Sequence, residues 1–208
     1  MSSADLLSLL EQLYLLKQFR RQGWIRAGIP ITDVETVAEH TFGVAILALV
    51  LYPLENKLRR ESKQLELNPE RILSIALAHD LAECKFQDLD TSLAILMGIE
   101  EFKELKQRLE EKSFLQIQEE LIKSLGTDVK LAKLMQQSPE LQFIQELDKL
   151  DVILQALNYS KRGLASIGVH QLLTEVLDSL QEPTSFSVRK VLSEIQGVWG
   201  NKKSQTGP

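Results

Sequence analysis

Histidine is scarce in this chain, and two of its three histidines lie beside carboxylates in segments that read as buried helices. His79 and Asp80 follow the apolar run 71–78, and His40 follows Glu39 in the segment 36–41. Buried imidazole and carboxylate groups are costly unless they are paired, hydrogen-bonded or bound to a metal. The sequence therefore predicts a metal site that these side chains build together.

Such a site needs ligands from several helices. Adjacent helical residues point about 100° apart, so His79 and Asp80 reach one cation only near a helix end or between converging helices. His40 can supply a second imidazole, and a later helix offers the carboxylates of Asp148 and Asp151. Two histidines with two carboxylates suit a divalent ion such as Mn, Co, Fe, Ni or Zn, with Mg as a further candidate. The alternative is that each histidine is a satisfied helix residue and each aspartate a surface charge, which is the commoner case for any one alone.

The elements that must position these residues are helices, because helical periodicity dominates and no alternating strand pattern occurs. Thr36 and Glu39 have the spacing of a capping box, which places His40 in the first turn of its helix. Pro53 falls near the end of that helix, although the pattern can continue to 58 after a kink. We expect an all-α single domain over 1–199 and a disordered tail over 200–208. The predicted helices span 3–20, 36–53, 69–83, 100–125, 128–135, 139–161, 169–180 and 187–199.

Composition restricts the function classes. The 208 residues are 44% hydrophobic and 25% charged, and the net charge of −5 provides no broad basic surface for a nucleic acid. A small phosphorylated substrate stays compatible, since a cation and one or two arginines can make a pocket positive. Cys84 is the single cysteine and forms no intrachain disulfide. The longest apolar run, 44–51, falls short of the ~20 residues of a membrane span, so a cytoplasmic protein is expected.

The ligand order resembles that of the HD-domain superfamily of metal-dependent phosphohydrolases, in which a histidine, a His-Asp pair and a distal aspartate come from different helices. The matching residues are His40, His79, Asp80 and Asp148. Within the superfamily the chain is similar to the branch of 5′-deoxynucleotidases and HD-domain-containing protein 2. The motifs that carry this resemblance are RQGW at 21–24, ETVAEHT at 35–41, HDLAEC at 79–84 and LDKLDVILQA at 147–156.

The resemblance implies an HD-domain helical bundle that binds a divalent metal and hydrolyses a phosphomonoester. Glu83 matches an acidic catalytic residue, and its position four residues after His79 predicts that both lie on one helix face. Asp88 matches a second acidic position on the following loop. Their separate roles toward the attacking water and the leaving group stay open.

The same resemblance implies a substrate-binding segment around Trp24, whose ring would lie near the sugar. Arg21 and Arg26 flank it, and either guanidinium could grip a phosphate. The alternatives are a half-buried core tryptophan and two solvated arginines. Asp151 reads as a carboxylate behind the ligands, a competing ligand or a surface residue.

We therefore expect an enzyme that removes phosphate from nucleoside 5′-monophosphates, with deoxynucleotides preferred. One alternative is hydrolysis of another phosphoester or nucleotide, and a second is a metal-containing nucleotide sensor without turnover. The loop 87–92 favours the sensor, because it lacks the glycine and proline that this branch usually has there. A di-iron oxygenase would need further histidines, and His170 is predicted to be exposed. We also expect a homodimer, with the helix 100–125 as a candidate contact between the two copies.

Overall fold

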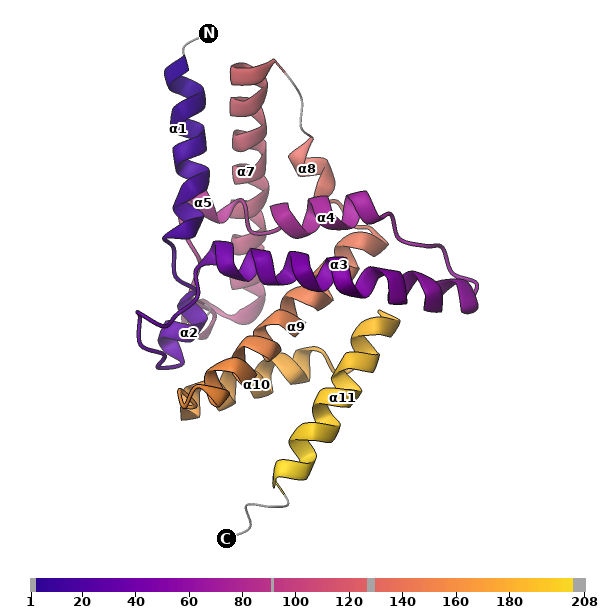
Figure 1. Cartoon of the computed structure of the whole chain (residues 1–208). Helices are drawn as coiled ribbons and strands as arrows, with labels where there is room; N and C mark the ends of the chain where they lie inside the picture. Colours follow the sequence, from indigo (N-terminus) through magenta and orange to yellow (C-terminus); the bar gives the residue numbers. More distant parts are fainter. Residues whose placement is uncertain (1–2, 91, 127–129, 204–208) are drawn as a thin grey trace.

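The protein is an assembly of helices. The computed structural model describes residues 3–90, 92–126 and 130–203, and these contain no β-strand, only one isolated bridge between Arg20 and Thr36 (Figure 1). The all-α prediction is thereby confirmed. The helices are α1 (Ser3–Tyr14), the 3-10 turn η1 (Leu15–Lys17), α2 (Gln22–Arg26), α3 (Val37–Glu61), α4 (Pro69–Ala78), α5 (Glu83–Phe86), α6 (Leu93–Met97), α7 (Ile99–Leu125), α8 (Leu131–Leu134), α9 (Pro139–Lys161), α10 (Ile167–Ser179) and α11 (Phe186–Lys203).

The helices form two packed groups that meet at the start of α3. Figure 1 shows α1 and α7 side by side, with α8 next to α7, and their apolar side chains form one core cluster. The second and larger cluster joins α3, α4, α9, α10 and α11. Val37 belongs to the first cluster and Val44 to the second, and both are fully buried. The first two turns of α3 therefore lie between two cores.

Local sequence signals account for most helix boundaries. The Thr36 hydroxyl accepts from the Glu39 amide, and the Glu39 carboxylate accepts from the Thr36 amide, so the predicted capping box begins α3. At α9, the Ser138 hydroxyl accepts from the Leu141 amide, and the predicted bounds 139–161 are correct. Gly126, with φ of 68°, ends α7 as predicted.

Other boundaries differ from the expectation. The helix α3 continues through Pro53 to Glu61, and the first predicted helix is divided, with α1 ending at Tyr14. The short helices α2 and α6 were not predicted, because five residues carry too little periodicity to be recognised. The helix α11 extends to Lys203, so 200–203 continue a helix rather than begin the predicted tail, and 204–208 lie outside the described residues.

Two buried carboxylates fasten the segment before α11 to the rest of the fold. Glu55 on α3 is fully buried and accepts hydrogen bonds from the Ser187 amide at 2.8 Å, the Ser187 hydroxyl at 2.9 Å and Arg59 Nε at 2.9 Å. Glu146 on α9 accepts from the amides of Thr184 and Ser185. Each carboxylate satisfies backbone donors near the start of a helix, where they have no intrahelical partner.

We expect Glu55→Ala to destabilise the protein by about 3 kcal/mol, because the change strands the Arg59 charge and the Ser187 donors in the interior. Glu66→Ala, which removes the exposed partner of Arg60, is the matched control and should cost less than about 1 kcal/mol. Urea unfolding followed by circular dichroism measures both. Equal effects of the two substitutions would contradict the structural role of Glu55.

Candidate metal centre

His40 occupies the first turn of α3 and is fully buried. Its two ring nitrogens face different groups. Nδ1 lies 2.8 Å from Asp151 Oδ2 on α9, in hydrogen-bond geometry. Nε2 lies 2.9 Å from Asp148 Oδ1 and 3.7 Å from Asp80 Oδ2. The Nε2 approach to Asp148 is close but does not have the direction of a hydrogen bond.

His79 lies just after the last residue of α4, at its C-cap. Its Nδ1 is 2.8 Å from the Ala76 carbonyl oxygen, and a carbonyl can only accept, so Nδ1 donates and Nε2 is the ring nitrogen left to face a cation. The chain then turns through 79–82 before α5 begins at Glu83. The predicted helix 69–83 is therefore wrong at its end, and Glu83 does not share a helix face with His79.

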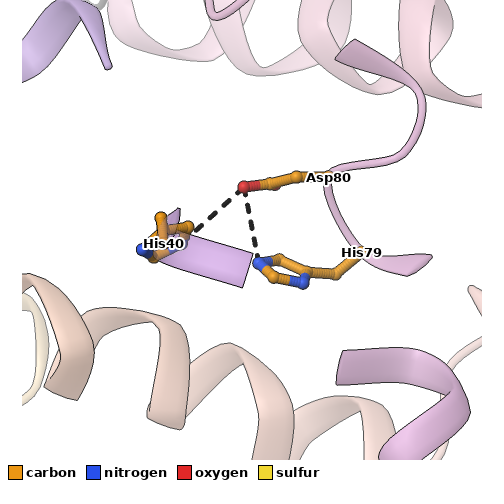
Figure 2. Close-up of side chains that lie close together, drawn as sticks. All are labelled: His40, His79 and Asp80. Carbon is orange, nitrogen blue, oxygen red and sulfur yellow. Dashed lines mark ion pairs between the residues drawn. The ribbon is translucent and has the colours of Figure 1, made fainter. Parts of the chain in front are cut away.

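Because α4 ends there, His79 and Asp80 can both turn toward His40. Figure 2 shows the three side chains converging from two elements, with His79 Nε2 3.4 Å from Asp80 Oδ2. One ligand atom from each lies within 4.8 Å of the other two. Neither histidine Nε2 has a hydrogen-bond partner among the described residues, and both are buried. Buried imidazole nitrogens beside carboxylate oxygens form a donor set that fits a divalent cation.

Asp151 supports this arrangement from behind, and Gly43 makes room for it. The Asp151 carboxylate fixes the His40 ring and its tautomer through Nδ1. A Cβ placed on Gly43 would overlap Asp151 Oδ1 and lie 3.0 Å from Asp151 Cγ. This contact with His40 Nδ1 is the one expected of a carboxylate behind the ligands, the first of the three interpretations that the sequence left open for Asp151.

We expect Gly43→Ala to displace Asp151 and to destabilise the protein by about 1–3 kcal/mol, as in other overpacked sites. A double-mutant cycle identifies the cause, since the same glycine substitution should be nearly neutral in an Asp151→Ala background. Thermal unfolding of the four proteins measures the coupling. Additive effects would show that Gly43 is needed for another reason.

The charges of this cluster influence one another strongly. Burial and Arg21 oppose protonation of His40, but Asp148 and Asp151 outweigh them and raise the pKa of His40 to about 10. Burial disfavours ionised Asp148, yet the contact with His40 holds its pKa well below the usual range. The pKa of Asp80 is also lowered, since His79 and Arg21 overcome the effect of its burial. In the absence of a cation, protonated imidazole balances these carboxylates.

Glu83 begins α5 and is buried, with an exposed fraction of 1%. Both carboxylate oxygens lack a hydrogen-bond partner among the residues described. Burial, with the negative charges of Asp80 and Asp88, raises the pKa of Glu83 well above its usual value. A buried carboxyl group whose pKa is raised in this way is a candidate for proton transfer in a hydrolytic site.

A cavity of about 250 Å³ opens beside the cluster. Arg21, Asp88, Lys106 and Asp148 line its polar part, and the remaining walls are largely apolar. Arg21 Nη1 lies 3.2 Å from Asp80 Oδ2, which directs the guanidinium toward the cluster. The site therefore combines cationic groups, carboxylates and apolar surface around one cavity.

Trp24 lies in the wall of the cavity and is 2% exposed. Its Nε1 donates to Glu35 Oε1 at 2.7 Å, and its ring meets that of Tyr159 edge to face, with centroids 5.1 Å apart. Asp88 Oδ2 accepts from the Gln22 amide at 2.5 Å, which ties α2 to the loop after α5. Trp24 is thus fixed in the core and exposes very little of its surface to the cavity.

One predicted substrate-binding side chain lies outside the cavity. Arg26 does not line the cavity, and its guanidinium lies 3.8 Å from Asp90. His170 is exposed as expected and lies within α10. Cys84 is buried, and burial raises the pKa of its thiol to about 11, in keeping with a structural role.

The helix α7 brings Lys106 and Glu110 to the cluster, which the sequence reasoning missed. Lys106 lines the first cavity and also a second one of about 390 Å³, whose walls include His79, Asp80 and Glu110. Glu83 and Asp80 raise the pKa of Lys106 despite its burial. The sequence of α7 is rich in charged residues, so it does not single out Lys106. Only the packing of α7 against the cluster distinguishes Lys106 from the other lysines of this helix.

The amino-acid sequence is similar to one protein family and to several named proteins. A family model described as HD domain matches residues 13–183. The Mus musculus protein named 5′-deoxynucleotidase HDDC2 is 31% identical over 163 residues, covering 76% of this chain and 71% of its own length. A Schizosaccharomyces pombe protein named 5′-deoxynucleotidase hdd1 is 28% identical over 168 residues, 77% of this chain and 75% of its own.

Solved structures share the fold. The PH0347 protein of Pyrococcus horikoshii OT3 superposes with a TM-score of 0.68 at 27% identity, covering 94% of this chain and 98% of its own. An HD-domain phosphohydrolase from Listeria innocua gives a TM-score of 0.67 at 18% identity, with coverage of 92% and 88%. The second similarity concerns the fold alone.

Proposed function

The chain belongs to the HD-domain family, and from this premise we propose that it is a metal-dependent phosphohydrolase that releases phosphate from nucleoside 5′-monophosphates, with deoxynucleotides preferred. The observation that carries the proposal is the pair of buried Nε2 atoms of His40 and His79, which lie beside Asp80 and Asp148 and have no hydrogen-bond partner among the described residues. The names of the relatives support the nucleotide as substrate.

The proposed ligands of the cation are His40, His79, Asp80 and Asp148. A divalent cation at this position would polarise the phosphoryl group. It would also lower the pKa of a bound water molecule, so that hydroxide becomes available at neutral pH. Asp151 holds the His40 ring so that Nε2 faces the cluster. The donor set is that of Mn, Co, Fe, Ni or Zn, and Mg is the further candidate.

The other residues of the cavity would bind and activate the substrate. Arg21 supplies a guanidinium for the phosphate, and Trp24 restricts the space around the sugar. Glu83 transfers the proton that hydrolysis requires, while Asp88 fixes the segment of Arg21 and Trp24 through the Gln22 amide. Arg26 as a phosphate ligand stays a prediction, and its contact with Asp90 does not support it.

Phosphate release from matched deoxy- and ribonucleoside 5′-monophosphates tests the proposal, with Mn, Co, Mg or a chelator in each assay. We expect metal-dependent release that is faster for the deoxynucleotides. Trp24→Phe should reduce the discrimination between the two sugars while the fold persists. Metal binding without release from any of these substrates would favour the sensor or another phosphoester, the two alternatives that the sequence left open.

Binding of the cation should release about one proton at pH 7. The pKa of His40 is about 10, so the ring is protonated in the metal-free protein and must become neutral to coordinate. The apparent affinity should therefore fall about tenfold for each unit that the pH is lowered through the neutral range. Isothermal titration calorimetry in two buffers with different ionisation enthalpies measures the proton. A heat that is independent of the buffer would contradict this assignment.

A further inference from the structure

One row of side chains on α7 runs past both cavities beside the cluster. Phe102, Lys106 and Glu110 are spaced four residues apart, so they lie on one face of this helix. Phe102 lines the first cavity, Glu110 lines the second, and Lys106 lines both. The two cavities therefore follow one another along α7, and Lys106 lies where they meet.

The cluster borders the same junction. Asp148 on α9, one of the proposed ligands, also lines both cavities. Arg21 lines the first cavity, while His79 and Asp80 line the second. A phosphate group placed at the junction would thus lie between the cluster and the row of side chains on α7.

The walls of the junction need positive charge if they are to hold a phosphate. Carboxylates are frequent along the two cavities, and those that line them are Asp80, Asp88, Glu110, Glu111 and Asp148. A phosphomonoester adds almost two further negative charges at neutral pH. Arg21 contributes a guanidinium, but its contact with Asp80 at 3.2 Å already offsets part of that charge. Lys106 brings a second cationic group to the place where the carboxylates converge.

The ammonium group of Lys106 can still donate to a ligand. Its Nζ lies 3.6 Å from Glu110 Oε1, which is an ion pair but longer than a normal N–H···O hydrogen bond. An ammonium group has three donors, so this loose pairing leaves it able to bind a further acceptor. Lys149 is the other lysine of the first cavity, and its Nζ donates to the Ser179 carbonyl oxygen at 3.1 Å.

We propose that Lys106 binds the phosphate group of the substrate, and the inorganic phosphate that hydrolysis releases, at the junction of the two cavities. The ammonium group donates a charge-assisted hydrogen bond to a phosphate oxygen. The nucleoside then occupies the first cavity, where Val152, Leu172 and Val176 provide apolar walls. This inference rests on the proposed function for the identity of the substrate, whereas the binding of inorganic phosphate tests it without a nucleotide.

The alternative role of Lys106 is to neutralise carboxylates that belong to the fold. Glu83 and Asp80 outweigh the effect of burial and raise the pKa of Lys106, so the lysine and the cluster interact. The two roles differ in what the loss of the charge does. Without Lys106, Asp80 should attract a divalent cation at least as strongly, while phosphate is held less strongly. A purely structural lysine would weaken both affinities when it is removed, because the cluster would lose its shape.

Lys106→Met tests the proposal, since methionine keeps much of the length of the side chain and removes its charge. Calorimetric titration of the Mn-loaded protein with inorganic phosphate should show an affinity about 10–100-fold lower, with the affinity for Mn unchanged or higher. Lys106→Arg should retain most of the phosphate affinity, because a guanidinium is also a cationic donor. Lys103→Met is the control, since Lys103 is exposed on the same helix and pairs with Glu100 at 2.7 Å. It should change neither affinity.

The outcomes separate this proposal from the proposed hydrolysis. If Lys106→Met binds phosphate as tightly as the unchanged protein does, Lys106 is not a phosphate ligand, although hydrolysis can still be measured. A parallel loss of phosphate and Mn affinity would also overturn the proposal and assign Lys106 to the support of the cluster. A selective loss of phosphate binding in a protein that hydrolyses no nucleotide would support Lys106 as a phosphate ligand and count against the nucleotide as substrate.

Discussion

Glu83→Gln should lower kcat by about 10²–10⁴-fold while the affinity for the divalent metal changes only slightly. Glutamine preserves the size of the side chain but cannot transfer a proton. The stability should not fall, because neither oxygen of the buried native carboxyl has a hydrogen-bond partner in the described part of the chain, and burial raises the pKa of Glu83 well above its usual value. Steady-state phosphate release, metal titration and the melting temperature together separate catalysis from folding.

Glu111→Gln is the matched control for this substitution. Glu111 lines the second cavity on α7 but is exposed, so its amide variant should retain full activity. If the activity of Glu83→Gln stayed within tenfold of that of the unchanged enzyme, Glu83 would not be the group that transfers the proton. A parallel loss of metal affinity would instead make Glu83 a ligand.

His79→Ala should weaken metal binding on the order of 10³-fold, which corresponds to about 4 kcal/mol. His79 Nε2 faces Asp80 and has no hydrogen-bond partner among the described residues, while Nδ1 donates to the Ala76 carbonyl. No neighbouring imidazole can replace it, because His40 already faces Asp148. Calorimetric titration with Mn or Co gives the affinity, and phosphate release should fall with it at a fixed metal concentration.

His170→Ala is the control for the second prediction, since this histidine is exposed on α10 and bonded to the Ser166 carbonyl. It should leave metal binding and phosphate release unchanged. Retention of high metal affinity in His79→Ala would contradict the proposed donor set. A loss of activity at saturating metal would then assign His79 to the substrate.

The sequence alone predicted the features that depend on short-range interactions. The capping box at Thr36 and Glu39, the serine cap of α9 and the glycine end of α7 each involve residues within one turn, so local pattern determines them. The all-α class follows from the same periodicity. The set of His40, His79, Asp80 and Asp148 was also recognisable, because buried histidines beside carboxylates are rare enough to be informative.

Only the tertiary structure decided how these side chains meet. The turn after Ala78 separates Glu83 from the helix of His79, a boundary that local propensity did not reveal because the apolar pattern continues across it. The contact of Asp151 with His40 spans 111 positions and depends on the small volume of Gly43. Lys106 reaches the cluster because α7 packs beside α5. Such contacts depend on packing between distant segments, and no local pattern encodes them.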